Sequence, residues 1–274
     1  MKAPRSARRD AAPQTGRLPL IAGNWKMNLD HLQAIALVQK LAWTLQDHGY
    51  DERIVEVAVF PPFTDLRSVQ TLISADRLPL RFGAQDLSPH ASGAYTGDIS
   101  GPLLKALDAT YVIVGHSERR SLHAETDQVV GAKVRAALDS ALVPVLCVGE
   151  TAEDREQQGA SAVPVAQLRA ALDGVPADAD LVVAYEPVWA IGSGQAATPE
   201  QAQEVCTALR VALGEVLGAE AADRTRILYG GSVKRDNIAD FMRQADVDGA
   251  LVGGASLDAA GFADIVRFPK HVTR

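Results

Sequence analysis

The feature of this sequence that most constrains its fold is a series of short apolar runs separated by longer segments of helical character. Eight runs follow residue 17, at 18–22, 54–60, 80–84, 111–114, 143–148, 181–185, 227–229 and 250–252. Short runs that are rich in branched side chains predict strands buried on both faces. Between them, stretches such as 127–140 and 199–217 carry apolar residues at helical spacing.

Strands that alternate with helices predict a parallel sheet. Eight such units within 274 residues favour closure into one (β/α)8 barrel, because these barrels commonly form single domains of about 250 residues. An open, doubly wound sheet is the alternative that the apolar pattern alone leaves standing. Hydrophobic residues make up 47% of the chain and charged residues 22%, so the chain can bury a core and stay soluble.

The charge of the chain is unevenly distributed and separates residues 1–17 from the rest. Five basic residues and one acidic residue give this segment a net +4, so residues 18–274 carry −11 within the formal total of −7. The prolines and the lack of apolar periodicity predict a disordered basic extension, with organellar targeting as a weaker alternative. We assign the barrel to residues 18–274, and its acidity argues against nucleic acid as a partner.

Cysteine content and hydropathy indicate the compartment. The chain has two cysteines, Cys147 and Cys206, and no apolar segment typical of a secretory signal. No apolar run reaches the ~18 residues that a membrane span requires. We therefore expect a cytoplasmic protein with no membrane partner.

Residues capable of chemistry follow seven of the eight predicted strands. They are Asn24 and Lys26, Gln85 and Asp86, His116 with Ser117 and Glu118, Glu150, Glu186, Gly230-Gly231 with Ser232, and Gly253-Gly254. The carboxyl ends of all strands in a parallel barrel open on one face, where such barrels place their active sites. We therefore expect these residues to converge.

The segment 184–194 predicts a catalytic base beneath a lid. Glu186 directly follows a buried strand, Pro187 ends that strand, and Gly192 and Gly194 give the following loop backbone freedom. For this segment taken alone, a surface glutamate in an ordinary strand-to-helix turn is the alternative.

Two glycine pairs predict a phosphate site. Gly230-Gly231 precedes Ser232, and Gly253-Gly254 follows the last strand. We expect a helical segment after each pair, whose N-terminal N–H groups favour an anion. The loops after strands seven and eight are the usual phosphate site of a (β/α)8 barrel, although each pair alone could be a plain turn.

Lys26 and His116 would supply a cation and a proton donor. Lys26 could project its ammonium beside the phosphate site with Asn24 as a neutral companion, unless it is an ordinary solvated lysine. His116 precedes a helical stretch, whose positive dipole end disfavours imidazolium, so we expect a neutral ring. We expect Glu118 either in a surface ion pair with Arg119 or behind Lys26 as a supporting carboxylate.

The expected chemistry needs no further group. No His, Cys and carboxylate residues have metal-ligand spacing, and neither a P-loop nor a dinucleotide fingerprint occurs, so we expect no metal and no cofactor. A base, a neutral proton donor, a cation, a phosphate site and a lid together predict proton abstraction next to a carbonyl. The substrate class is a small phosphorylated molecule.

Several motifs, in this order, resemble those of the triosephosphate isomerase family over nearly the whole chain from Leu18. The matching strings are 24–28 (NWKMN), 94–98 (AYTGD), 114–120 (VGHSERR), 147–150 (CVGE), 184–192 (AYEPVWAIG), 229–232 (YGGS) and 251–256 (LVGGAS). The resemblance implies a single-domain TIM barrel that interconverts dihydroxyacetone phosphate and D-glyceraldehyde 3-phosphate through an enediolate. This reaction belongs to glycolysis and gluconeogenesis and needs neither cofactor nor metal.

The resemblance also implies roles for individual residues. Glu186 would move the proton between C1 and C2, and neutral His116 would polarise the carbonyl. Lys26, with Asn24 beside it, would stabilise the enediolate charge and the phosphate, and Ser117 would hold Glu186 in its resting position. Backbone N–H groups would bind the phosphate at Gly192, Ser232, Gly253 and Gly254.

Family members are mostly homodimers, and the segment from Gln85 to Ile99 resembles the loop that carries Thr96 into the partner's active site. The resemblance therefore implies a homodimer. This chain departs from the family pattern at Ser193 and Gln195, where the lid usually has Thr and Lys, and at Ala124, which replaces a common Gly.

Two rival functions stay open at this point. The first is another barrel isomerase that acts on a different sugar phosphate, which the lid string 186–192 argues against. The second is a catalytically silent scaffold on the same fold, because a fold does not determine its function. The presence of Lys26, His116 and Glu186 together argues against a silent protein.

Overall fold

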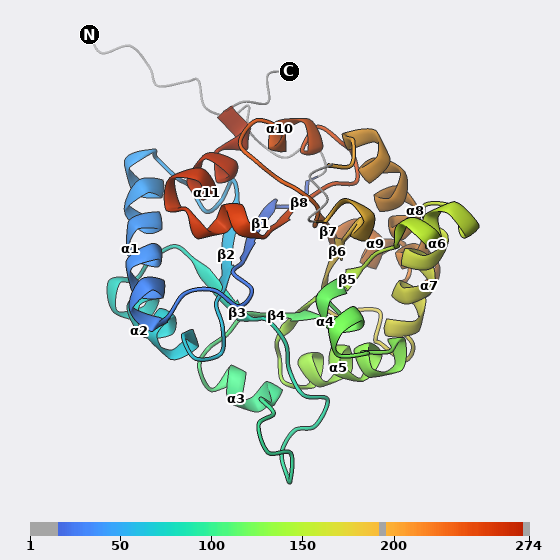
Figure 1. Ribbon diagram of the computed structural model, residues 1–274, viewed down its shortest axis with the longest axis horizontal. Coiled ribbons are helices and arrows are strands. Elements are labelled where there is room, and N and C mark those ends of the chain that lie inside the picture. The colour runs from blue at the N-terminus through green and yellow to red at the C-terminus, as the bar shows by residue number, and fades with distance from the viewer. Residues whose placement is uncertain (1–15, 192–195, 271–274) are drawn as a thin grey trace.

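The computed structural model describes residues 16–191 and 196–270, within which eight parallel strands close into a barrel (Figure 1). Each strand pairs with the next along the chain, and β8 pairs with β1. The strands are β1 Leu20–Asn24, β2 Glu56–Phe60, β3 Arg81–Ala84, β4 Tyr111–Val114, β5 Val143–Val148, β6 Val182–Tyr185, β7 Arg226–Tyr229 and β8 Gly249–Val252. The predicted (β/α)8 barrel is confirmed, and the pairing of β8 with β1 rules out the open sheet.

Helices surround the barrel in the described ranges (Figure 1). The α-helices are α1 His31–Asp47, α2 Leu66–Asp76, α3 Gly101–Lys105, α4 Ser117–Leu122, α5 Asp127–Asp139, α6 Ala152–Gln158, α7 Ala162–Ala171, α8 Pro199–Leu217, α9 Ala219–Arg224, α10 Ile238–Phe241 and α11 Ala259–Val266. Three short 3-10 helices are η1 Val188–Ala190, η2 Gly254–Leu257 and η3 Phe268–Lys270. The helix predicted at 199–217 is α8, and its start follows from Thr198, whose side chain accepts the Gln201 N–H, with Pro199 at the first helical position.

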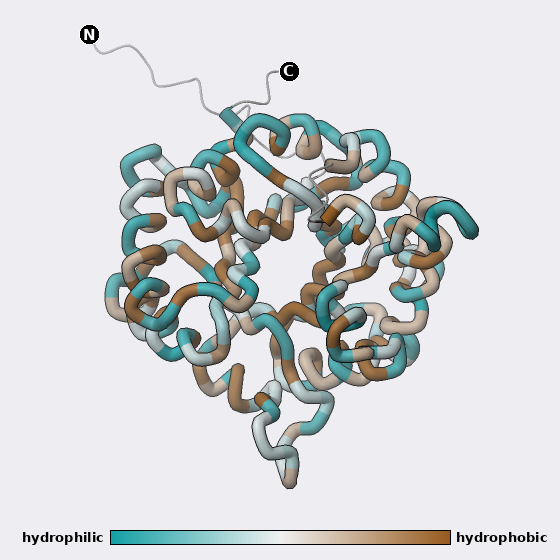
Figure 2. Tube along the Cα trace, viewed as in Figure 1, coloured by the Kyte–Doolittle hydropathy of each residue, from teal (hydrophilic) through white to brown (hydrophobic). Residues whose placement is uncertain are grey.

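Two apolar cores hold the strands in place. One lies inside the barrel and includes Ala22, Ile113, Val145 and Leu228, all buried. The larger one lies between the barrel and the helices. Figure 2 shows hydrophobic residues concentrated on the central strands, while hydrophilic residues are more frequent on the outer sides of the helices. Strands buried on both faces explain why each one is a nearly continuous apolar run in the sequence.

The N-terminal end of the barrel interior contains a cluster of paired polar groups. Arg226, Glu56 and Tyr111 are the first residues of β7, β2 and β4. The Arg226 guanidinium pairs with the Glu56 carboxylate and donates to Tyr111 Oη at 2.8 Å. Burial, assisted by Glu56 and opposed by Arg226, raises the pKa of Tyr111 to about 12. These groups fill one end of the barrel and satisfy one another.

The first strand differs from the prediction. It spans Leu20–Asn24 rather than 18–22, so Asn24 is the last residue of β1 and does not follow it. Asn24 is buried like the four residues before it. Hydrophobicity fails to mark this end because the barrel interior becomes polar here. Upstream, Arg17, which the charge pattern groups with the basic extension, pairs with Asp248 at 2.7 Å.

Three expectations concern segments beside the barrel. The lid residues Gly192, Ser193, Gly194 and Gln195 lie outside the described residues, as does segment 1–15. Ala124 has a φ of 53°, in the left-handed region that favours glycine, so this departure from the family pattern carries backbone strain. Among the helices that the structure describes, none combines the length and hydropathy needed to cross a membrane.

Candidate active site

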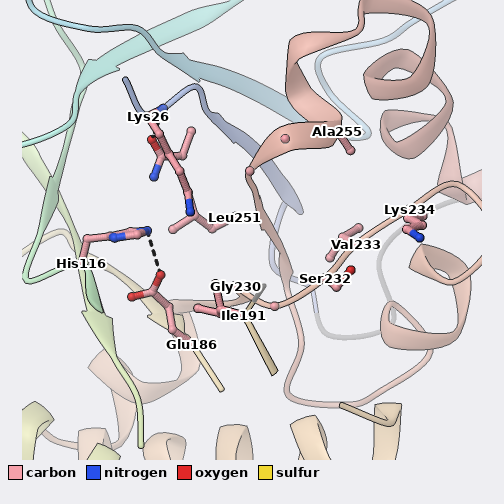
Figure 3. A pocket seen from close by; sticks show the side chains of 14 residues that line it. Lys26, His116, Glu186, Ile191, Gly230, Ser232, Val233, Lys234, Leu251 and Ala255 are labelled. Carbon is pink, nitrogen blue, oxygen red and sulfur yellow. Dashed lines mark hydrogen bonds and ion pairs between the residues drawn. The ribbon is translucent and has the colours of Figure 1, made fainter. Parts of the chain in front are cut away.

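A pocket of about 350 Å³ opens at the carboxyl ends of the strands (Figure 3). Its walls come from the ends of β1, β4, β6, β7 and β8 and the loops that follow them. The predicted residues that line it are Asn24, Lys26, His116, Glu186, Gly230, Gly231, Ser232, Gly253 and Gly254. The expected convergence is therefore present for five of the seven strand ends, whereas the residues predicted after β3 and β5 do not line the pocket.

Glu186 directly follows β6 and is 2% exposed. Two glycines allow its position, because a Cβ on Gly149 would lie 1.8 Å from the Glu186 carbonyl oxygen and one on Gly230 would lie 2.9 Å from Glu186 Cγ. The carboxylate accepts the Ser117 N–H through Oε2 at 2.9 Å and contacts His116 Nε2 through Oε1 at 2.9 Å. Its side chain therefore crosses from β6 to the end of β4.

These contacts determine the acidity of Glu186. Burial alone would raise the pKa of the carboxyl group, but His116, the Ser117 N–H and Lys26 together hold the pKa below its ordinary value. The same burial would make the group a stronger base once it lost those partners. The resting contacts therefore keep the pKa of Glu186 low, and their loss would raise it.

His116 is the residue before α4 and is also buried. Its Nδ1 accepts the Glu118 N–H at 3.2 Å, which requires an unprotonated Nδ1 and places the ring proton on Nε2. Burial opposes a charge on the ring, yet the adjacent Glu186 carboxylate raises the pKa of His116. The hydrogen bond at Nδ1 therefore favours the neutral ring of the prediction, whereas Glu186 opposes it for as long as it stays in contact.

Lys26 lies two residues beyond β1 in a strained conformation, with a φ of 53°. The Asn24 side chain accepts its backbone N–H at 3.0 Å, and Gln85 donates to its carbonyl at 2.8 Å. Its ammonium contacts Glu118 Oε1 at 2.5 Å. Figure 3 shows the side chain extending into the pocket, and its Cε lies 3.6 Å from where a Cβ on Gly253 would be.

The two expectations for Glu118 can now be compared. Glu118 pairs with Lys26, whereas Arg119 pairs with Glu125 and Asp86. The surface ion pair between Glu118 and Arg119 is therefore not formed, and Glu118 is the carboxylate behind the lysine. Sequence adjacency misleads here because residues 118 and 119 point in different directions from a helix.

The glycine loops differ in part from the prediction. Gly254 begins η2 directly, as expected, but the first helix after Gly230 is α10, which starts only at Ile238. A turn replaces the expected helix start, because Asn237 donates to the Ser232 carbonyl at 3.0 Å and accepts the Lys234 N–H at 2.8 Å. Sequence analysis missed Asn237, although an Asn beside a glycine loop is a typical turn signal.

Glu150 lies on the expected face of the barrel but does not line the pocket. It is buried, and its Oε1 accepts Tyr185 Oη at 2.9 Å and Trp189 Nε1 at 2.8 Å. Arg155 contacts the same oxygen at 3.1 Å. Glu150 thus anchors η1, the short helix directly after Pro187.

The segment from Gln85 to Ile99 forms a loop that projects between β3 and α3 (Figure 1). Its base is closed by the bond from the Ser88 N–H to the Ile99 carbonyl at 2.8 Å. Residues 91–98 are all exposed, Thr96 among them, and Thr96 does not line the pocket of its own chain. In the described part of the chain, no group of three or more His, Cys, Asp or Glu side chains could hold a metal ion.

Comparisons with known proteins point in one direction. The family model described as triosephosphate isomerase matches residues 19–269. A triosephosphate isomerase from Leifsonia xyli subsp. xyli is 70% identical over 93% of this chain and 99% of its own length. The Streptomyces coelicolor triosephosphate isomerase is 57% identical over 93% of this chain and 98% of its own, and the Mycobacterium tuberculosis one is 56% identical over 91% and 95%.

Proposed function

The chain belongs to the triosephosphate isomerase family, and we propose that Glu186, His116 and Lys26 carry out its interconversion of dihydroxyacetone phosphate and D-glyceraldehyde 3-phosphate. The observation that carries this assignment is a single pocket in which His116 Nε2 lies 2.9 Å from Glu186 Oε1 and which Lys26 also lines. A base, a proton donor and a cation can then reach one small substrate.

In the first step, Glu186 takes a proton from C1 of dihydroxyacetone phosphate. To do so, the carboxylate turns away from His116 and Ser117, whose contacts hold its pKa down in the resting arrangement. Because burial remains after that turn, the basicity of Glu186 rises as it meets the substrate. Electrons from the C–H bond move into the C1–C2 bond, and the carbonyl becomes the enediolate oxygen.

His116 and Lys26 stabilise the oxygen charge that develops. His116 donates its Nε2 proton to the substrate oxygen once Glu186 has left, and departure of that carboxylate removes the larger of the two carboxylate effects that raise the pKa of His116. The ring then acts as a neutral donor that can move a proton between the two oxygens. Lys26, oriented by Asn24, Gln85 and Glu118, supplies the fixed positive charge.

The phosphate is placed against the loops after β7 and β8. Backbone N–H groups of Ser232, Gly253 and Gly254 hold its oxygens, and Lys26 lies against Gly253. Gly192 would add an N–H from the lid, but it lies outside the described residues. Glu186 finally returns its proton to C2, which gives D-glyceraldehyde 3-phosphate and restores the enzyme.

A coupled assay on the purified protein tests this function. Conversion of D-glyceraldehyde 3-phosphate to dihydroxyacetone phosphate is followed through NADH oxidation by glycerol-3-phosphate dehydrogenase. The control is Glu186→Gln, which keeps the shape but removes the base. We expect the parent to turn over D-glyceraldehyde 3-phosphate and the control to be inactive. Ribose 5-phosphate, tested separately by direct product analysis, should not be converted. Conversion of ribose 5-phosphate without conversion of D-glyceraldehyde 3-phosphate would support a different sugar-phosphate isomerase.

We further propose that the protein is a cytoplasmic homodimer held by the loop from Gln85 to Ile99. The loop is closed at its base while eight successive residues at its tip have no cover from their own chain. Met27, next to Lys26, is 95% exposed, and a second copy docked at this face would cover it. Cys147 and Cys206 are buried free thiols, as suits a reducing compartment.

Thr96→Arg tests the dimer, because an arginine at the loop tip would have to be desolvated in the contact. Sedimentation should give monomers with weak activity. Gln46→Arg, on the exposed side of α1, adds the same charge elsewhere and should leave the dimer intact. An unchanged, active Thr96→Arg dimer would remove this loop from the interface.

A further inference from the structure

Lys234 lies at the rim of the pocket and is exposed. Figure 3 shows it beyond Ser232 and Val233, on the side of the pocket away from His116 and Glu186. Among the residues that the structure describes, its ammonium has neither an ion-pair nor a hydrogen-bond partner. Lys26, the other lysine of the pocket, is already paired with Glu118.

The backbone of Lys234 is held in place, although no residue that the structure describes pairs with its ammonium. Its N–H is held by Asn237 Oδ1 at 2.8 Å, and the same Asn237 holds the Ser232 carbonyl at 3.0 Å. Val233, between them, is buried. The turn therefore fastens the lysine backbone two residues from Ser232, which the proposed mechanism assigns to the phosphate.

The charges around the pocket would not attract a phosphate dianion without a further cation. Lys26 is offset by Glu118, and Glu186 adds a further negative charge. Residues 18–274 carry a net −11, so the body of the protein repels a phosphate dianion at a distance. Without Lys234, a triose phosphate would approach a site with no excess positive charge.

We infer that Lys234 is a capture residue, which attracts the phosphate dianion of the incoming triose and guides it to the Ser232 loop. This inference rests on the proposed isomerase function. Lys234 would act on the encounter and on ground-state binding of the phosphate, while proton transfer would stay with Glu186. Its contribution should therefore appear in kcat/KM and fade as salt screens the charge.

The test uses three variants of the full-length protein. Lys234→Gln removes the charge, Lys234→Arg keeps it, and Lys40→Gln removes a charge from the exposed side of α1 as the matched control. The kcat and KM for D-glyceraldehyde 3-phosphate are measured from about 10 mM to about 300 mM ionic strength, a range over which the screening length falls from about 30 Å to below 10 Å.

We expect Lys234→Gln to lower kcat/KM about two- to fivefold at the lowest ionic strength, with kcat unchanged and the difference vanishing at the highest. Lys234→Arg and Lys40→Gln should match the parent. The inference is overturned if Lys40→Gln has the same effect, if Lys234→Arg loses as much as Lys234→Gln, or if the loss does not depend on salt. An inactive parent protein would instead refute the proposed function.

Discussion

The two ends of the barrel both bury charged groups, but they treat them differently. At the N-terminal end, Arg226 pairs with Glu56 and Tyr111 in an enclosed cluster. At the C-terminal end, Glu186 pairs with His116 on the wall of an open pocket. The partners at the first end are permanent, whereas a substrate can replace those at the second.

The difference teaches that burial of a charge does not by itself mark a functional site. An enclosed ion pair contributes specificity or stability only through its own geometry. Removal of one partner leaves the charge of the other uncompensated. In an exchangeable pair the pKa can change: contacts that Glu186 can leave hold its pKa low, so its basicity rises when a substrate replaces them.

The largest effect is expected for Lys26→Met at the exchangeable end. The enediolate and the phosphate would both lose their cation, so kcat should fall by about 10³-fold or more. Because Glu118 is half-exposed and can be solvated, the folding stability should change little. Parallel thermal unfolding and the coupled assay measure both quantities, and persistent activity in a folded variant would make Lys26 an ordinary surface residue.

Glu186→Asp should have the next largest effect. The shorter side chain withdraws the carboxylate by one methylene, and misplacement of about 1 Å can cost about 10²-fold in rate. We expect the loss in kcat rather than in KM, because the phosphate contacts remain. Steady-state kinetics decide it, and a variant within about threefold of the parent would exclude Glu186 as the base.

At the enclosed end, Glu56→Gln should act on stability and leave catalysis alone. Arg226 would lose its charged partner, at a cost of about 2 kcal/mol in the free energy of unfolding, since Glu56 is partly exposed. Urea unfolding measures this, and kcat/KM of the folded fraction should equal that of the parent. A fall in kcat/KM with unchanged stability would mean that the two ends do not differ as described.

The smallest effect is expected for Tyr111→Phe, and it should depend on pH. At pH 8 the variant should be about 1 kcal/mol less stable, because Arg226 loses an acceptor. The folded-state pKa of Tyr111 is raised from 10.0 to about 12, so the tyrosine contributes fully below pH 10 and loses its contribution as the pH rises toward 12. Ionisation of the unfolded tyrosine costs the parent about 1.4 kcal/mol per pH unit between pH 10 and 12. In urea unfolding the difference between parent and variant should therefore fall from about pH 9.5, reach zero near about pH 10.7 and change sign by about pH 11.5, whereas a constant difference would contradict the assignment.

The fold could be predicted from sequence because strands buried on both faces leave a strong signal. β4 and β5 begin and end at the predicted residues. The prediction failed at the end of β1, where Asn24 is part of the strand although it is polar. Hydropathy marks a strand only while both of its faces touch apolar groups, and that condition ends where the pocket begins.

The residues of the site could be predicted from their places at strand ends, but their contacts could not. The bond from Gln85 to the Lys26 carbonyl joins residues 59 apart, and the pair of Lys26 with Glu118 joins residues 92 apart. Spacing in the sequence gives no side-chain direction over such distances. Lys234 carried no signal at all, because an exposed lysine after a glycine loop has the same sequence appearance whether or not it faces a pocket.

The cluster at the N-terminal end also determines the route by which substrate and product enter and leave the barrel. Arg226, Glu56 and Tyr111, with the apolar interior above them, close the barrel axis, so substrate and product share one doorway past Lys234. The two trioses carry the same phosphate, so a cation at a shared entrance changes the binding free energy of both molecules by the same amount. Conversion in both directions can become faster, but the equilibrium constant between the two trioses is a property of the molecules and not of the protein.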